Sequence, residues 1–273
     1  GAGTQKYGGN TPCVSIHNDS TDIILDAGTG IRDLGIDLTQ HHKPLQIHLF
    51  LSHTHWDHIQ GLPFFAPAYV KGNKLSIYGS PKKERFLAGI LSHQMDMNYF
   101  PVDMNALAAE LSIAEISSSQ FDIGPFTVDW QEQICHPGGS VRYGLNCRGK
   151  KIVYATDVEL DKLFTANGKI RPGSRTPAAD YTKFIKDADL LIADGQYTEE
   201  EYPSRAGWGH SSIATLIQVA GKAGVKQLAV FHHDPQHTDA TIDMMWDRYS
   251  KLARKTNRSM TIFWAREGMT ISV

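Results

Sequence analysis

Short apolar runs, each followed by turn residues, recur along the whole chain. The runs are rich in Val, Ile, Leu, Phe and Tyr and are bounded by Gly, Asp, Asn or Pro. This pattern is typical of β-strands. It predicts strands at Cys13–His17, Ile23–Asp26, Ile47–Leu51, Lys74–Tyr78, Phe126–Trp130, Lys151–Ala155, Leu190–Ala193, Leu228–Phe231, Met260–Trp264 and Met269–Val273.

Helical periodicity is less frequent, and its clearest instance is Ser211–Ala223, which Gly224 would end. Asp239 or Thr238 could cap the longest helix. Thr165–Thr176 has the composition of an exposed loop. Strands dominate the first half of the chain, and strands alternate with helices in the second half. This order indicates packed sheets with helices outside them, in a single α/β domain of residues 1–273. The predicted helices are Lys82–His93, Asp180–Lys186, Ser211–Ala223 and Asp239–Lys255.

Four side chains of metal-ligand type lie within six residues, at His53, His55, Asp57 and His58. They follow the strand at Ile47–Leu51, and alternate residues of an extended segment share a side. His58 would turn toward the same space as a helical turn begins at Ile59. Three imidazoles and a carboxylate suit a borderline cation such as Zn²⁺. A polar surface loop is the alternative, but such a loop seldom needs so dense a set of ligand types.

Three further candidate ligands each follow a later strand. His136 comes after Phe126–Trp130, Asp157 after Lys151–Ala155, and His232 after Leu228–Phe231. Taken singly, each is equally consistent with a loop histidine or a helix-capping aspartate. Taken with the first cluster, all lie at strand ends and could converge on one site.

The composition of the chain limits which partners and which cellular location we expect. The chain of 273 residues carries 27 Lys and Arg against 29 Asp and Glu, a net charge of −2, so no overall cationic field attracts nucleic acid. Three cysteines argue against a disulfide framework and predict a cytoplasmic, reducing location. No signal peptide or membrane-spanning run is visible, so we expect no membrane partner. The abrupt start at Gly1 leaves room for a truncated N-terminus or a missing partner domain.

Taken together, these motifs resemble the metallo-β-lactamase superfamily over nearly the whole chain. The resemblance begins at Asp26-Ala27-Gly28-Thr29-Gly30 and continues through the His-x-His-x-Asp-His segment to His136, Asp157 and His232. Within the superfamily the chain looks most like the ribonuclease Z branch. Leu190–Gly195 resembles the strand that ends in that branch's second acidic residue, here Asp194. Gly209-His210-Ser211-Ser212 resembles its His-Ser-Thr segment.

The resemblance implies an αββα four-layer sandwich that binds two divalent metal ions. Zn²⁺ is the first choice for them, with Mn²⁺ or Fe as alternatives. It implies that Asp26 is a structural group behind the ligands and that Asp157 bridges both ions. His233 is the alternative to His232 as the last ligand. The implied ligands are His53, His55 and His136 for one ion and Asp57, His58 and His232 for the other.

The resemblance further implies a phosphodiesterase in which a metal-bridging hydroxide attacks phosphorus. Asp57, His210 and Asp194 are the predicted catalytic residues. His210 would donate to a phosphoryl oxygen or to the leaving group, and Asp194 would orient its ring. Ser211 or Ser212 would cap a helix whose N-terminus favours an anion.

The chain departs from the branch between His136 and Asp157, where many tRNA-processing members carry a long arm. Only 21 positions separate the two residues here (157 − 136), and the cations at Lys162, Lys169 and Arg171 are scattered. We therefore expect a small-molecule or nucleotide phosphodiester as substrate rather than tRNA. A homodimer is left open.

Three other functions compete with the phosphodiesterase. The first is hydrolysis of a lactone, thioester or β-lactam at the same site. The second is a redox di-iron protein, which His55 disfavours because it stands where those relatives carry a carboxylate. The third is a sensory or binding module that has lost catalysis, which the complete ligand set disfavours.

Overall fold

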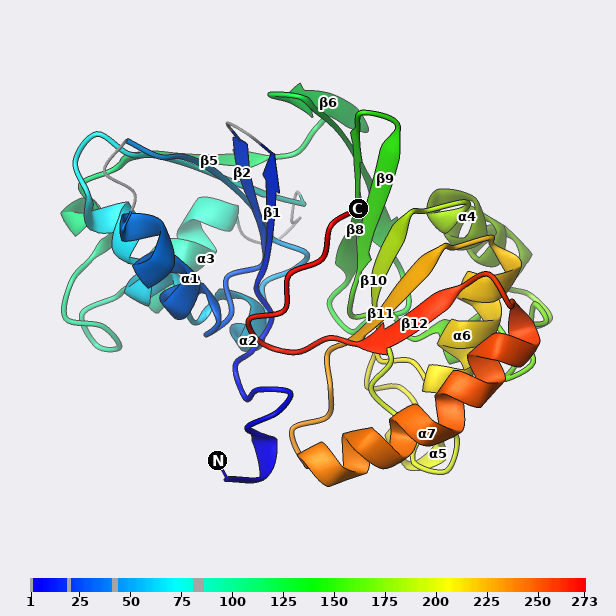
Figure 1. Cartoon of the computed structure of the whole chain (residues 1–273). Coiled ribbons are helices and arrows are strands. Elements are labelled where there is room, and N and C mark those ends of the chain that lie inside the picture. The colour runs from blue at the N-terminus through cyan, green and yellow to red at the C-terminus, as the bar shows by residue number, and fades with distance from the viewer. Residues whose placement is uncertain (1, 19–20, 41–43, 81–85) are drawn as a thin grey trace. The chain divides into compact units, whose positions relative to one another are not determined.

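The computed structural model describes residues 2–18, 21–40, 44–80 and 86–273. The chain forms two compact units. We call residues 10–125 the N-terminal unit, and residues 1–9 together with 126–273 the C-terminal unit. Each unit has helices and a sheet of its own, which Figure 1 shows in blue to cyan for the first and in green to red for the second.

The sheet of the N-terminal unit is mostly parallel. Its strand order is β1-β2-β3-β4-β5, and only the β1–β2 pair is antiparallel. Leu25 at the end of β2 pairs with Phe50 at the end of β3, so the chain leaves both strands at the same edge. The strands of this sheet are β1 (Val14–Asn18), β2 (Thr21–Leu25), β3 (Gln46–Phe50), β4 (Lys74–Gly79) and β5 (Glu110–Glu115). The unit also contains the short strand β6 (Gln120–Ile123), which is not part of this sheet.

The helices of this unit pack on the apolar side chains of its sheet. Ile31 of α1 and Leu91 of α3 belong to one buried cluster with Ile24, Leu49 and Ile77 of the strands. Burying such side chains is the main stabilising contribution, at about 1.5–3 kcal/mol each. The elements are α1 (Ile31–Thr39), α2 (Trp56–Ile59) and α3 (Leu87–Gln94), with 3₁₀ turns η2 (Leu62–Phe64), η3 (Ala66–Tyr69) and η4 (Met104–Ala106).

Gly28 lies where the loop after β2 touches the backbone of two other segments. A Cβ there would come 2.4 Å from the carbonyl oxygen of Asp57 and 2.6 Å from that of Pro12. We expect Gly28→Ala to lower the free energy of unfolding by about 1–3 kcal/mol, because backbone must move to admit the methyl group. Denaturant unfolding would measure the change.

Gly89 provides a matched control inside α3, where an added Cβ meets nothing within 4 Å. Gly89→Ala should raise the free energy of unfolding by about 0.5–1 kcal/mol, because alanine restricts the unfolded chain more than glycine does. Equal and small effects at both positions would contradict the close approach at Gly28.

The sheet of the C-terminal unit combines parallel and antiparallel pairs. Its strand order within the unit is β12-β11-β10-β9-β8-β7. Strands β9 to β12 are parallel, whereas β7, β8 and β9 are antiparallel neighbours. The loops after β9, β10 and β11 therefore leave from one edge. The strands are β7 (Phe126–Gln133), β8 (Ser140–Cys147), β9 (Lys150–Ala155), β10 (Leu190–Asp194), β11 (Gln227–Phe231) and β12 (Thr261–Trp264).

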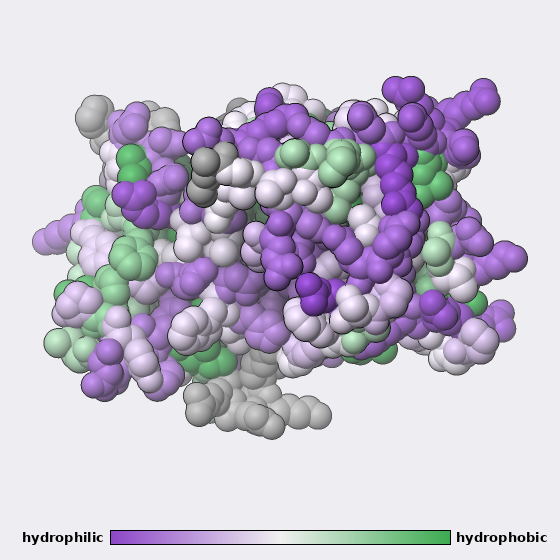
Figure 2. All heavy atoms as spheres, turned by 90° about the horizontal axis from the view of Figure 1, so that it is seen from below, coloured by the Kyte–Doolittle hydropathy of each residue, from purple (hydrophilic) through white to green (hydrophobic). Residues whose placement is uncertain are grey.

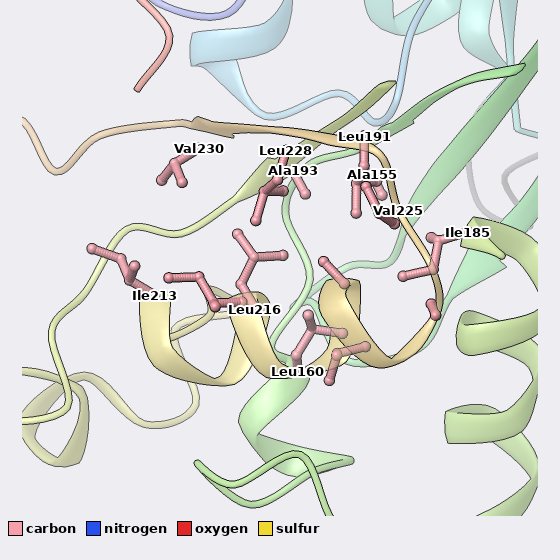
Figure 3. Close-up of a cluster of buried hydrophobic side chains, with 14 of the residues drawn as sticks. Ala155, Leu160, Ile185, Leu191, Ala193, Ile213, Leu216, Val225, Leu228 and Val230 are labelled. Atoms are coloured by element: carbon pink, nitrogen blue, oxygen red, sulfur yellow. The ribbon is translucent and has the colours of Figure 1, made fainter. Parts of the chain in front are cut away.

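Helices α4, α6 and α7 cover one face of this sheet (Figure 1). Ile213 and Leu216 of α6 point toward Ala193, Leu228 and Val230 of the strands, which makes this layer the main core of the unit (Figure 3). The N-caps are Ser212 for α6 and Thr238, not Asp239, for α7. The helices are α4 (Arg175–Ile185), α5 (Tyr202–Arg205), α6 (Ile213–Lys222) and α7 (Asp239–Thr256), with 3₁₀ turns η1 (Ala2–Thr4) and η5 (Leu160–Lys162).

Several predicted elements were wrong or incomplete. Met269–Val273 forms no strand, since it has no ladder partner among the described residues. Helix α4 begins at Arg175 rather than Asp180, because Pro177 fits the first turn of a helix instead of ending a loop. The start of the helix predicted at Lys82–His93 lies outside the described residues, and α3 covers the rest. Strands β5, β6 and β8 and helices α1, α2 and α5 were missed.

One face of the molecule carries mainly hydrophilic side chains (Figure 2). Figure 2 shows one face on which hydrophilic residues predominate and hydrophobic ones form small, separate patches. Among the residues that the structure describes, no helix combines the length and the apolar character that crossing a bilayer requires. Within the described part of the chain, Cys13, Cys135 and Cys147 form no disulfide.

Candidate metal centre

The first group of candidate ligands follows β3 in the N-terminal unit. Helix α2 begins at Trp56 rather than at Ile59, so Asp57 and His58 lie in its first turn. The turn closes early because the His58 amide donates to the carbonyl oxygen of His55 at 3.0 Å. His55 itself has an extended backbone and caps the helix. The segment is therefore extended up to His55 and helical after it.

Asp26 holds this segment from behind. It directly follows β2, is fully buried, and has a positive φ of 63°. One carboxylate oxygen accepts from the Ser52 amide at 2.7 Å, and the other accepts from the Ser52 hydroxyl at 2.8 Å. The second oxygen also lies 2.8 Å from Nδ1 of His58. A proton on Nδ1 leaves the lone pair of Nε2 free to bind a metal.

Three imidazoles meet in front of Asp26. The ring centroid of His53 lies 4.4 Å from that of His55 and 4.2 Å from that of His58. The partly exposed carboxylate of Asp57 lies 3.2 Å from Nε2 of His58. Packed imidazoles with one carboxylate are the donor set that Zn²⁺ prefers, so the chemistry of these residues fits such an ion. All four predicted ligands of this unit are thus brought together.

The second group lies at strand ends of the C-terminal unit, around Asp157. Its carboxylate oxygens lie 3.5 Å from Nε2 of His232 and 3.9 Å from Nε2 of His136. Asp157 and His232 both have positive φ, at 56° and 60°. Non-glycine residues seldom adopt this conformation, and those that do cluster at functional sites. The loops after β7, β9 and β11 therefore bring together the three ligands predicted in this unit.

His233, the alternative last ligand, points elsewhere. Its Nε2 lies 2.8 Å from the carbonyl oxygen of Ala265, and its ring packs edge-on against Tyr7. Burial lowers the pKa of His233 and keeps its ring neutral. The geometry thus favours His232 as the residue beside Asp157.

His210 forms a buried pair with Asp194 beside this group. Nδ1 of His210 lies 2.7 Å from Oδ2 of Asp194, and 3.8 Å from Oδ1 of Asp157. Burial alone would lower the pKa of His210, but the Asp194 carboxylate outweighs it and raises that pKa. The ligand atoms of His136, Asp157 and His210 also lie within 4.8 Å of one another. His210 is therefore placed either to donate a proton or to act as a further ligand.

The loop before His210 fixes the ring of His136. Nδ1 of His136 lies 3.0 Å from the carbonyl oxygen of Gly209, which leaves Nε2 directed at Asp157. Gly209 has a φ of +94°, and a Cβ there would lie 2.3 Å from Nδ1 of His136. Only glycine allows the backbone to come this close.

Glu159 holds that loop and was missed by the sequence analysis. Its buried carboxylate accepts from the Tyr202 hydroxyl at 2.7 Å and from the amides of Gly207 at 2.8 Å and Gly209 at 3.2 Å. Burial alone would raise the pKa of Glu159, but these hydrogen bonds and Lys162 hold it below its usual value. Nothing in the local sequence marks this glutamate, because the segment from Asp157 to Lys162 alternates charged and apolar residues.

The N-terminus of α6 was predicted to bind an anion, but the carboxylate of Asp161 already lies there. Its carboxylate accepts from the amide and hydroxyl of Ser212, at 2.7 and 2.8 Å, and from the hydroxyl of Thr215. The helix N-terminus is therefore already satisfied by a carboxylate of the chain itself. Ser211 does not cap the helix, since its hydroxyl donates to the carbonyl oxygen of Val158.

The chain is similar in sequence and in structure to several known proteins. Ribonuclease Z of Brevibacillus brevis is 25% identical over 222 residues, which cover 70% of this chain and 69% of that protein. Unliganded yeast PDE1 matches with a TM-score of 0.68 at 16% identity, over 97% of this chain and 95% of that one. Human tRNase Z, short form, matches with a TM-score of 0.63 at 17% identity, over 99% and 96%.

These matches decide the fold and the family. The structural matches extend over nearly the whole chain, so the predicted α/β class and metallo-β-lactamase fold are confirmed. The resemblance to ribonuclease Z is confirmed as well, and it gives no support to the expectation that tRNA is excluded. The sequence model of the Beta-lactamase superfamily domain matches residues 21–233, well over half of the chain. The chain belongs to this family, the metallo-β-lactamase superfamily of hydrolases.

Proposed function

We propose that the chain is a metal-dependent phosphodiesterase whose two groups of ligands bind two divalent metal ions, with Zn²⁺ as the first choice. Asp157 would contact both ions. The family resemblance supports this assignment, as do the packed donors within each unit. The proposed ligands are His53, His55 and His136 for one ion and Asp57, His58 and His232 for the other.

Bound divalent ions would supply an activated water and charge neutralisation on the phosphoryl oxygens. The residues of the chain have separate tasks. Asp26 and the Gly209 carbonyl hold His58 and His136 by their Nδ1 atoms. Asp194 holds His210 with the proton on Nδ1 and favours the charged ring, so Nε2–H can donate to a phosphoryl oxygen or to the leaving group.

The Asp194–His210 pair is the observation that carries the choice of phosphorus chemistry. Its carboxylate outweighs the effect of burial and raises the pKa of His210, which favours the protonated ring. A charged donor 3.8 Å from the carboxylate of Asp157 suits a transition state that gains negative charge on several oxygens. A lactone or β-lactam develops charge on one carbonyl oxygen and on its leaving atom, whereas a phosphodiester also carries charge on two non-bridging oxygens, which gives a charged donor more to stabilise.

A nucleotide substrate is favoured by the loop before His210. The indole of Trp208 is 58% exposed two residues before His210, and the guanidinium of Arg205 lies 4.8 Å from its ring centroid. Exposed aromatic rings beside a cation are places where nucleobases stack. The relatives named ribonuclease Z and tRNase Z keep an RNA 3′ end among the candidate substrates.

A screen of metal-reconstituted enzyme tests the proposal. It compares bis(p-nitrophenyl) phosphate, cyclic nucleotides, a 3′-extended tRNA, a lactone and a β-lactam, with metal content measured in every sample. We expect a phosphodiester to be hydrolysed, activity to vanish on chelation, and Zn²⁺ or Mn²⁺ to restore it. Activity on the lactone or β-lactam alone would overturn the proposal, and iron with redox activity would favour the di-iron alternative.

A further inference from the structure

A small cavity lies in the C-terminal unit behind the loop that carries His136. Its volume is about 210 Å³. The end of β7 and the residues after it form one wall, and the first turns of α4 form another. Its lining includes Gln133, Arg142 and Tyr181, with Val158, Leu163 and Pro177 as apolar walls. No proposed metal ligand lines it, although Cys135, the residue before His136, does.

Three buried polar atoms without a hydrogen-bond partner belong to residues that line this cavity. They are Nε of Arg142, the hydroxyl oxygen of Tyr181 and Oε1 of Gln133. The three residues are only 4%, 0% and 2% exposed, respectively. A buried polar atom that stays without a partner destabilises the folded protein. Three of them around one cavity point to a missing polar ligand rather than to a single irregularity.

The positive charge of Arg142 indicates that the missing ligand is an anion. Its guanidinium donates to Gln131 and lies 5.1 Å from the ring centroids of both Tyr181 and Phe184. Among the residues that the structure describes, no carboxylate lies within 4 Å of it. Burial lowers the pKa of Arg142 to about 10, so it stays charged at neutral pH. Asp180 is near enough to raise the pKa of Arg142 but makes no ion pair with it, so a carboxylate in direct contact would stabilise the buried guanidinium further.

The other residues that line the cavity restrict the charge, size and polarity of the ligand. Glu132 and Asp180 also line the cavity and are exposed, so a dianion would meet two like charges there. A volume of about 210 Å³ is below the roughly 300–1,000 Å³ of sites for drug-sized ligands. The apolar walls suit a short hydrocarbon body. The unpartnered Gln133 oxygen calls for a donor on the ligand, because the amide nitrogen of Gln133 already donates to Ser140 and Thr156.

We propose that this cavity is a binding site for a small organic monocarboxylate, separate from the metal centre. The carboxylate would accept from Arg142 and from the Tyr181 hydroxyl, and a hydroxyl or amino group beside it would donate to Gln133. The apolar body would lie against Val158, Leu163 and Pro177. The site does not depend on the proposed phosphodiesterase activity, and its test uses binding alone.

Calorimetric titration of the full chain with 2-hydroxy-4-methylpentanoate tests this site, with the corresponding neutral amide and inorganic phosphate as comparison probes. We expect saturable binding of the acid, with the amide binding about tenfold more weakly because it lacks the charge-assisted contact. No saturable binding of the acid, or tighter binding of phosphate than of the acid, would overturn the proposal.

Two variants of the cavity lining, with one control variant elsewhere, test whether the acid binds in the cavity. Arg142→Met should abolish binding of the acid, whereas Arg254→Met, on the exposed side of α7, should leave it unchanged. Tyr181→Phe should weaken binding about 3–10-fold while leaving the melting temperature of the free protein unchanged or higher, because the hydroxyl has no partner there. A lower melting temperature of Tyr181→Phe would show that the hydroxyl already has a structural partner, and would contradict the inference.

Discussion

Replacing His210 with alanine should lower kcat on a phosphodiester by about 10²–10⁴-fold while the bound metal stays in place. The expectation follows from the pair that His210 forms with the buried carboxylate of Asp194 at 2.7 Å. That contact orients the ring and raises its pKa, which favours the protonated form. Steady-state kinetics and metal analysis of the same purified sample provide the two measurements.

His237 provides the control for this variant. It is also a buried histidine paired with a carboxylate, since its Nε2 lies 2.9 Å from Glu201. His237→Ala should leave kcat within about threefold of the parent value, because no proposed step uses this ring. Loss of metal from His210→Ala would instead make His210 a ligand, which its position near Asp157 and His136 also permits. Full activity with metal retained would remove His210 from the mechanism.

Replacing Asp26 with alanine should lower the free energy of unfolding by about 3–5 kcal/mol and weaken metal binding about 10–100-fold. Three buried donors, the amide and hydroxyl of Ser52 and Nδ1 of His58, would lose their acceptor. The ring of His58 would also lose the contact that directs Nε2. Chemical denaturation and titration with a competing chelator measure the two effects.

Two further variants test the predicted effects of Asp26 on stability and on metal binding. Asp26→Asn keeps the size of the side chain and tolerates the positive φ of 63°, but it has one acceptor oxygen for donors that now use two. It should therefore fall between the parent and Asp26→Ala in both measurements. Asp33→Ala removes an exposed carboxylate that pairs only with Arg32, and it should change stability by less than about 0.5 kcal/mol. Unchanged metal affinity in Asp26→Ala would contradict the orienting role of Asp26.

The sequence predicted the elements whose signals are local. Apolar runs such as Ile47–Leu51 and Leu228–Phe231 coincide with buried parallel strands, because both faces of such strands are covered. The missed β8 has an interrupted pattern, since Arg142 and Gly144 fall within it. The predicted strand at Met269–Val273 failed for the opposite reason, because an apolar run is a strand only where a neighbour supplies a ladder.

The candidate ligands were found from the sequence because metal chemistry restricts residue type. The dense segment from His53 to His58 needed no fold to be noticed, and Asp157 and His232 were found because each follows a strand. The positive φ of Asp157 and of His232 was beyond sequence reasoning, since backbone conformation at a loop depends on what surrounds it.

The sequence by itself therefore predicted the superfamily correctly and proposed the candidate metal donors and the strands that precede them. Only the tertiary structure revealed the buried carboxylates that hold the loops near the candidate donors. Glu159 holds the loop of Gly209 and His210, and Asp161 occupies the N-terminus of α6. The carboxylates of Glu159 and Asp161 act on atoms about 50 positions away. Their identity carries no local signal, because a hydrogen bond across the fold depends on distance in space and leaves no period in the sequence.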